Sequence, residues 1–219
     1  EAAIGACEKL GITPTGKRTG ALDPADEGSD DVAFLGATGV HIDVLTQWSG
    51  KGSDLFQTAD KAFSLCDEHG IDGFTFDSDG LGASIRGDAK VINERRRAQG
   101  IRQIAVSAFR GSEGVFDPEG EMVPGRKNKD FFKNAKAQAW WRLRILFENT
   151  YKAVVKGLPF DPDEIISIDP NLPLRNQLMG ELCQPVYSIN TTGKVVVDKA
   201  PNGTKSPNLA DTVMIRYQP

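Results

Sequence analysis

Acidic residues end two apolar stretches of this sequence and recur near its C-terminus. Asp23 ends "TGALD", Asp77 ends "GFTFD" with Asp79 two residues later, and Asp211 follows "SPNLA". Carboxylates at the tip of a buried strand cost free energy unless a metal ion, a donor or water meets them. In open α/β sheets that tip is where ligands bind. Because Mg²⁺ and similar cations prefer a few carboxylate ligands, three acids from distant segments indicate a metal site.

Each of these aspartates also has an ordinary structural interpretation. Asp23 precedes Pro24 and can open a turn, whereas Asp77 can cap the turn at Gly80. Asp211 can be a solvated helix residue, or it can stabilise the N-terminus of a helix. Their order along the chain, with two strand ends followed by a C-terminal helix, favours a shared site.

Other common sites are not expected. The three cysteines are scattered without a CxxC pair, and the two histidines, His41 and His69, are interpreted as structural, so a zinc site is not predicted. Unpaired thiols fit a reducing cytoplasm. "GITPTGKR", Gly11 to Arg18, resembles a phosphate-binding loop, but Arg18 replaces the required hydroxyl residue and no strand precedes it.

Charge is distributed unevenly along the chain. The net charge is −4 and the sequence pI about 5.3, with acid concentrated in residues 23–31 and base in residues 93–102 and 125–144. A local basic groove can neutralise DNA phosphates without reading sequence, although solvated helix faces would have the same composition. The candidates are Arg95, Arg96, Arg97, Arg102, Arg126, Lys127, Lys129, Lys133 and Lys136, together with Lys199 and Lys205, which flank Asp211. Of these, Arg126, Lys127, Lys129, Lys199 and Lys205 are the predicted DNA contacts.

The apolar periodicity predicts one α/β or mixed-sheet domain. We expect strands over 18–23, 31–38, 40–48, 71–77, 101–109 and 163–169, helices over 54–70, 83–100, 128–157, 174–184 and 206–217, and a hairpin over 185–199 that turns at Thr192 and Gly193. Residues 110–128 are predicted to form a loop, and Trp140 and Trp141 to lie in the core. Ser206 is the expected cap of the last helix.

The ends of the chain suggest a piece of a longer protein. Residues 1–18 are interpreted as a linker or lead-in and residues 19–219 as the domain. The absence of an initial methionine suggests that something precedes Glu1. No apolar run approaches the ~20 residues of a membrane span, so no membrane association is expected.

Four segments together carry a family resemblance: "LDPADEGSDDVAF", "FTFDSDGLGAS", "NKDFFKNAKAQAWW" and "KSPNLADTVMIRY". The chain resembles the C-terminal nuclease domain of the large terminase subunit of tailed bacteriophages, the DNA-packaging motor. The resemblance implies a ribonuclease-H-like fold, with a mixed central sheet flanked by helices, and an endonuclease that cuts double-stranded DNA. By motif, Asp23, Asp77 and Asp211 are then the catalytic, metal-binding residues, with Asp79 as the second candidate for the middle position. The implied cofactor is Mg²⁺ or Mn²⁺, with two ions.

The same resemblance implies an upstream ATPase domain in the same polypeptide, a portal protein and a small terminase subunit as partners, and action in the host cytoplasm. Two alternatives remain open. One is another ribonuclease-H-like nuclease, such as a Holliday-junction resolvase or a transposase core, although "SPNLAD" disfavours it. The other is a catalytically silent module that clamps or docks DNA.

Overall fold

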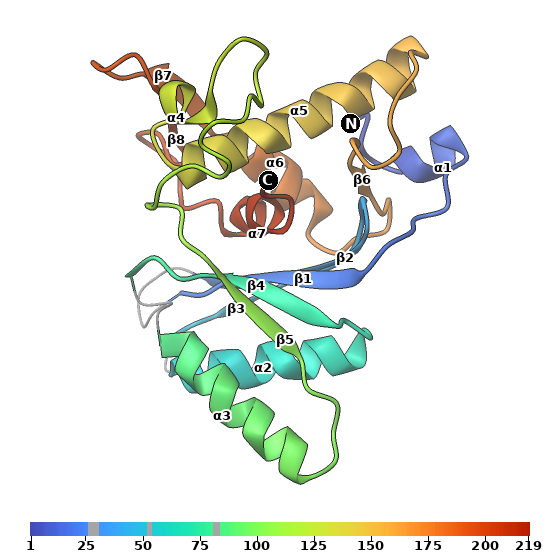
Figure 1. Ribbon diagram of the computed structural model, residues 1–219. Coiled ribbons are helices and arrows are strands. Elements are labelled where there is room, and N and C mark those ends of the chain that lie inside the picture. The colour runs from blue at the N-terminus through green and yellow to red at the C-terminus, as the bar shows by residue number, and fades with distance from the viewer. Residues whose placement is uncertain (26–30, 52–53, 81–83) are drawn as a thin grey trace.

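A computed structural model describes residues 1–25, 31–51, 54–80 and 84–219 (Figure 1). Its helices are α1 (Ala6–Leu10), α2 (Leu55–Glu68), α3 (Ile85–Ala98), α4 (Asn128–Phe131), α5 (Ala135–Lys156), α6 (Arg175–Leu182) and α7 (Asn208–Arg216). Its strands are β1 (Arg18–Asp23), β2 (Asp31–Thr38), β3 (His41–Ser49), β4 (Gly73–Asp77), β5 (Ala105–Phe109), β6 (Ser167–Ile168), β7 (Val186–Ile189) and β8 (Val195–Asp198). Most of the acidic segment 23–31 and part of the turn after Gly80 lie outside the described residues.

Six strands form one mixed sheet in the order β5-β4-β1-β2-β3-β6. β4 lies parallel to both β1 and β5, whereas β2 is antiparallel to β1 and β3. β7 and β8 form a separate antiparallel hairpin. β1 is buried over residues 20–23 and β2 over residues 32–37, and apart from Asp23 these positions are glycine or apolar residues.

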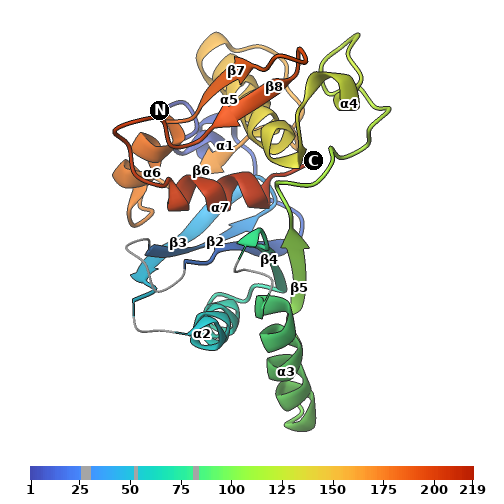
Figure 2. The same cartoon turned by 90° about the vertical axis from the view of Figure 1, so that its left-hand side faces the viewer.

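Helices cover both faces of the sheet (Figures 1 and 2). Because side chains alternate along a strand, Ala21 and Leu35 join one core with α5, α6 and α7, whereas Leu22, Phe34 and Phe76 join the other with α2 and α3. The alternation also places Asp23, two residues after Ala21, on the α7 face. Asp77 follows Phe76 and therefore faces the same way.

Four sequence predictions differ from the structure. The strand expected over 101–109 begins only at Ala105. The helix expected from residue 128 is divided into α4 and α5, because Asn134 adopts an extended conformation and its side chain accepts a hydrogen bond from the Ala137 N–H. The strand expected over 163–169 is reduced to β6. Ser206 does not cap the last helix: the carboxylate of Glu181 in α6 accepts hydrogen bonds from the N–H groups of Leu209 and Ala210.

Residues 1–18 are largely ordered against the rest of the chain. They contain α1, the side chains of Ala6 and Cys7 are buried, and the Cys7 N–H donates to Ser167 Oγ. Gly39 turns β2 into β3 with φ +53, and a Cβ there would lie 2.0 Å from the Thr15 carbonyl oxygen. A division of the chain at residue 19 stays a prediction.

Two arginines considered for a DNA groove are instead paired within the fold. Arg96 is buried and donates two hydrogen bonds of 2.7 Å to the carboxylate of Asp67, and Arg102 donates to Asp72 at 2.9 Å. Asp72 precedes β4, so this cluster lies where the parallel strands begin. Asp23 and Asp77 stand where those strands end.

We predict that Asp67→Asn lowers the free energy of unfolding by about 1–2 kcal/mol at pH 7, because an amide cannot accept both hydrogen bonds from the Arg96 guanidinium, and because Asp67 itself is partly exposed. The hydrogen bond from Arg96 lowers the pKa of Asp67 in the folded state. The stabilisation is therefore present above the unfolded pKa of about 3.9 and is lost as the pH falls through the folded pKa. Urea unfolding at pH 7 and pH 3 measures both values, with Asp60→Asn on the exposed side of α2 as the control. An equal penalty at the two pH values would contradict the assignment.

Candidate active site

Asp23 and Asp77 end two neighbouring parallel strands at one edge of the sheet. β1 and β4 are paired in a register that matches Leu22 with Phe76, so the residues that follow them stand side by side. Asp23 is only 8% exposed. Burial is the main cause that raises its pKa well above the usual value, and the charges of Asp211 and Asp77 add to it.

Helix α7 brings Asp211 to the same place. The helix packs on β1 and β2, and Asn208 Nδ2 donates to the Asp31 carbonyl at 2.8 Å, which ties the start of α7 to the start of β2. Asp211 is 1% exposed, and its Oδ1 atom has no hydrogen-bond partner. Burial raises its pKa, and Lys199 opposes that rise.

Two lysines interact with the charges of these carboxylates. Lys199, which follows β8, forms an ion pair and hydrogen bond with Asp211 Oδ2. Burial lowers the pKa of Lys199, but the nearby carboxylates, chiefly Asp211 and Asp23, raise it by more, so the pKa is raised overall. Lys136, in the first turn of α5, lowers the pKa of both Asp23 and Asp211 through its charge. Its N–H donates to the Gly111 carbonyl at 2.9 Å, which fixes this turn beside the end of β5.

Asp77 and Asp79 have different surroundings. Burial raises the pKa of Asp77, and Asp211 contributes to the rise. Asp79 instead accepts hydrogen bonds from the N–H and the hydroxyl of Ser112 at 2.9 and 2.7 Å, so it ties the turn after β4 to the loop after β5. Asp77 also has a structural partner, because its Oδ1 accepts the Asp79 N–H at 2.9 Å. The charges of Asp77, Asp23 and Asp211 affect one another's pKa, so Asp77 stays the predicted ligand, with Asp79 as the second candidate.

The predicted DNA contacts do not form one continuous group. Lys127 and Lys129 both pair with the carboxylate of Glu119, and Arg126 lies over the ring of Phe131. Lys199 points into the acid cluster, whereas Lys205 is exposed. The loop over 110–128 is held by buried Asn128, whose side chain bonds to the backbone of Met122, Phe116 and Asp117.

The donor set fits a divalent cation. Three carboxylates with raised pKa values lie at one edge of the sheet, and Asp211 Oδ1 is buried without a hydrogen-bond partner. A cation there would offset the free-energy cost of their negative charge. Within the described part of the chain, no three His, Cys, Asp or Glu side chains are already arranged as a metal-ligand group. The Lys199 ammonium, paired with Asp211, accounts for part of the charge balance.

Comparison with solved structures identifies the family. The nuclease domain of the large terminase subunit of bacterial virus Sf6 superposes with TM-score 0.86 and 32% identity, over 100% of this chain and 95% of that chain. The chain belongs to the phage large-terminase nuclease domains. A lysine-to-alanine mutant of the Sf6 domain, with manganese and beta-thujaplicinol, gives TM-score 0.87 at 32% identity over the same shares. The large terminase nuclease of thermophilic phage G20c, at TM-score 0.56, 14% identity and 94% and 83% coverage, shows the same fold.

No family model and no curated protein sequence matches the chain. The predicted resemblance and the ribonuclease-H-like fold, with its mixed sheet between helices, are confirmed by the structural neighbours. Among the described residues, none of the helices of this terminase nuclease domain is long and apolar enough to cross a membrane.

Sequence reasoning missed two roles in this terminase nuclease domain. It did not place the carboxylate of Glu181 at the N-terminus of α7, and it treated Lys199 only as a DNA contact. Both depend on contacts between segments distant in sequence. The one local signal was the position of Lys199 directly after a predicted strand and shortly before "SPNLAD".

We predict that Asp23→Asn raises the free energy of unfolding of the metal-free domain by about 1 kcal/mol or more, since a pKa raised by about one unit already costs ~1.4 kcal/mol. The folded pKa of Asp23 is raised, so its ionised form costs folding free energy above the unfolded pKa of about 3.9, and the amide removes that cost. Chelator-treated protein is compared by urea unfolding at pH 7.5.

Asp79→Asn is the matched control. Since Asp79 accepts two hydrogen bonds from Ser112, its substitution is expected to leave stability unchanged or to lower it. A loss of stability in Asp23→Asn would mean that Asp23 is stabilised by partners and is not a strained charge.

Proposed function

We propose that this domain hydrolyses phosphodiester bonds of double-stranded DNA with a divalent metal held by Asp23, Asp77 and Asp211. The observation that carries the proposal is the convergence of three carboxylates with raised pKa values at the ends of β1 and β4 beneath α7. Its support from relatives is the Sf6 nuclease domain, which is 32% identical and has been solved with manganese and with calcium. Mg²⁺ or Mn²⁺ is the proposed cofactor, with two ions.

The metal, the aspartates and the lysines have separate proposed roles. Bound divalent metal supplies a water of lowered pKa and stabilises charge on the leaving oxygen. Asp23, Asp77 and Asp211 would hold the cations, and Asp77 would contribute to binding both. Lys199 keeps part of the buried negative charge neutral by pairing with Asp211. Lys136 adds positive potential at the mouth of the cluster, where a phosphate would enter.

The biological setting is proposed from the family. The domain would cut DNA concatemers during viral genome packaging in the host cytoplasm, downstream of an ATPase domain of the same polypeptide. Duplex DNA is the proposed substrate, and the portal protein and the small terminase subunit are the proposed partners. A catalytically silent DNA clamp is the alternative that a cleavage assay separates from this proposal.

We predict that Asp23→Ala, Asp77→Ala and Asp211→Ala each lower the cleavage of supercoiled plasmid by at least about 100-fold, since each removes a metal ligand. The parent protein should nick and linearise the plasmid with Mg²⁺ or Mn²⁺ and stop when chelator is added. Gel assays of single turnovers give the rates, and circular dichroism shows that each variant is folded.

Asp79→Asn is again the control, and it should retain most of the cleavage. Parent-like cleavage by any one alanine variant would remove that residue from the site, and loss of cleavage only in the Asp79 variant would reverse the choice between Asp77 and Asp79. Cleavage that persists in excess chelator would contradict the metal mechanism, and no cleavage by a folded parent protein with either metal would favour the silent clamp.

The basic loop gives a separate prediction about binding. Replacing Arg126, Lys127 and Lys129 by Gln should weaken duplex binding alike for all sequences. Because each lost phosphate contact reduces the slope of log affinity against log salt by about 0.9, the loss of one to three contacts should make this slope measurably less steep. Because Glu119 holds both lysines, Glu119→Gln should have the opposite effect and strengthen binding. Fluorescence anisotropy across a salt titration measures both slopes.

Arg95→Gln with Arg97→Gln serves as the comparison, because these exposed side chains belong to α3 near the opposite end of the sheet. A triple-variant slope equal to that of the parent would make the loop an ordinary solvated surface. If the Arg95→Gln, Arg97→Gln variant instead shows a less steep salt dependence of binding, the DNA groove lies beside α3.

A further inference from the structure

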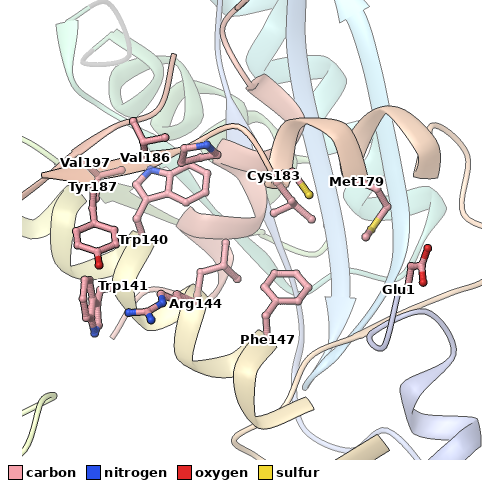
Figure 3. A pocket seen from close by; sticks show the side chains of 13 residues that line it. Glu1, Trp140, Trp141, Arg144, Phe147, Met179, Cys183, Val186, Tyr187 and Val197 are labelled. Atoms are coloured by element: carbon pink, nitrogen blue, oxygen red, sulfur yellow. The ribbon is translucent and has the colours of Figure 1, made fainter. Parts of the chain in front are cut away.

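A second candidate site lies beside the hairpin of β7 and β8. A cavity of ≈ 370 Å³ is lined mainly by apolar side chains of α5, α6 and the hairpin, among them Trp140, Trp141, Phe147 and Leu182 (Figure 3). None of the proposed metal ligands lines it. Its size and apolar lining are those of pockets that bind small ligands or peptide side chains.

Trp140 carries a buried donor without a partner, and the exposed Arg144 supplies the one cationic side chain among the described residues that line the cavity. Trp140 is 7% exposed, and its Nε1 donor is buried without a hydrogen-bond partner. The Arg144 guanidinium lies over the rings of Trp141 and Tyr187, 4.7 and 5.9 Å from their centroids, and it is in none of the ion pairs of the described residues. A buried donor usually finds an acceptor, and arginine on an aromatic platform is suited to a carboxylate.

The hairpin adds an open strand edge next to the cavity. β8 is bonded on its outer side, because the Lys133 N–H donates to the Val195 carbonyl at 2.9 Å. β7 pairs only with β8 within the described chain. Its Val186, Tyr187 and Ile189 are 52%, 57% and 57% exposed. An exposed apolar edge of this kind is a template for an added strand.

We propose that an extended peptide of a partner protein adds to the free edge of β7, places an apolar side chain in the cavity and pairs an acidic residue with Arg144. Figure 3 shows Glu1 beyond Phe147 and Met179, away from Arg144, so the acidic residue belongs at the Arg144 end. A single cation among apolar walls fits a peptide better than a nucleic-acid strand, which would need a run of cations.

The test begins with a random 12-residue peptide library displayed against this domain. We expect enrichment of sequences that combine apolar residues with at least one acid. Arg144→Glu should lower the affinity for the tightest-binding synthetic peptide by at least about tenfold. Replacing the acidic residue of that peptide by lysine should restore its binding to the Arg144→Glu variant. Arg86→Glu, on the exposed side of α3, is the matched control and should bind as the parent does.

Alkylation of Cys183 tests independently whether the peptide binds in the cavity. It lines the cavity and is exposed, whereas Cys7 and Cys66 are buried. Bound peptide should therefore slow alkylation of Cys183 and shift the indole N–H resonance of Trp140. No enriched peptide, binding that ignores Arg144→Glu, or unchanged alkylation would each overturn the proposal. So would an oligodeoxythymidylate that protects Cys183 where peptides do not, since that would make the face a nucleic-acid surface.

Discussion

Three carboxylates at one edge of the sheet, two of them buried and that of Asp77 half-buried, are the constraint on which this part of the molecule depends. Asp23 and Asp77 are placed by strand register, and Asp211 by the packing of α7. Their charges raise one another's cost because water is largely excluded. The fold balances that cost with Lys199 and with the field of Lys136, and it anchors α7 through Glu181 and Asn208. Ionised carboxylates held close together with little water are suited to binding a cation.

Much of this arrangement could be predicted because its signals are local. β1 and β4 end in acid after apolar residues, and α7 shows apolar residues at helical spacing after a proline. Alternation along the strands is enough to place Asp23 and Asp77 on one face once their strands are known to be parallel neighbours. The family resemblance supplied that neighbour relation, which periodicity alone does not contain.

The remainder depends on contacts that sequence spacing does not encode. Whether a basic residue faces DNA or a carboxylate is decided by partners far along the chain, as Arg96 with Asp67 and Lys199 with Asp211 show. The break between α4 and α5 had a weak local signal in Asn134, which was outweighed by the long apolar pattern around it. Trp141 was predicted to lie in the core, but it is half-buried, packs edge-to-face on Tyr187 of the hairpin and forms a wall of the open cavity.

The central claim is that the strand-end carboxylates form a divalent-metal site. Crystals of the domain grown with Mn²⁺ and measured at the manganese absorption edge test it directly through the anomalous signal. The account predicts anomalous density within about 2.0–2.6 Å of carboxylate oxygens of Asp23, Asp77 and Asp211, with the Lys199 ammonium moved away from Asp211. Anomalous density at Asp79, or none near these three residues at saturating Mn²⁺, would contradict it.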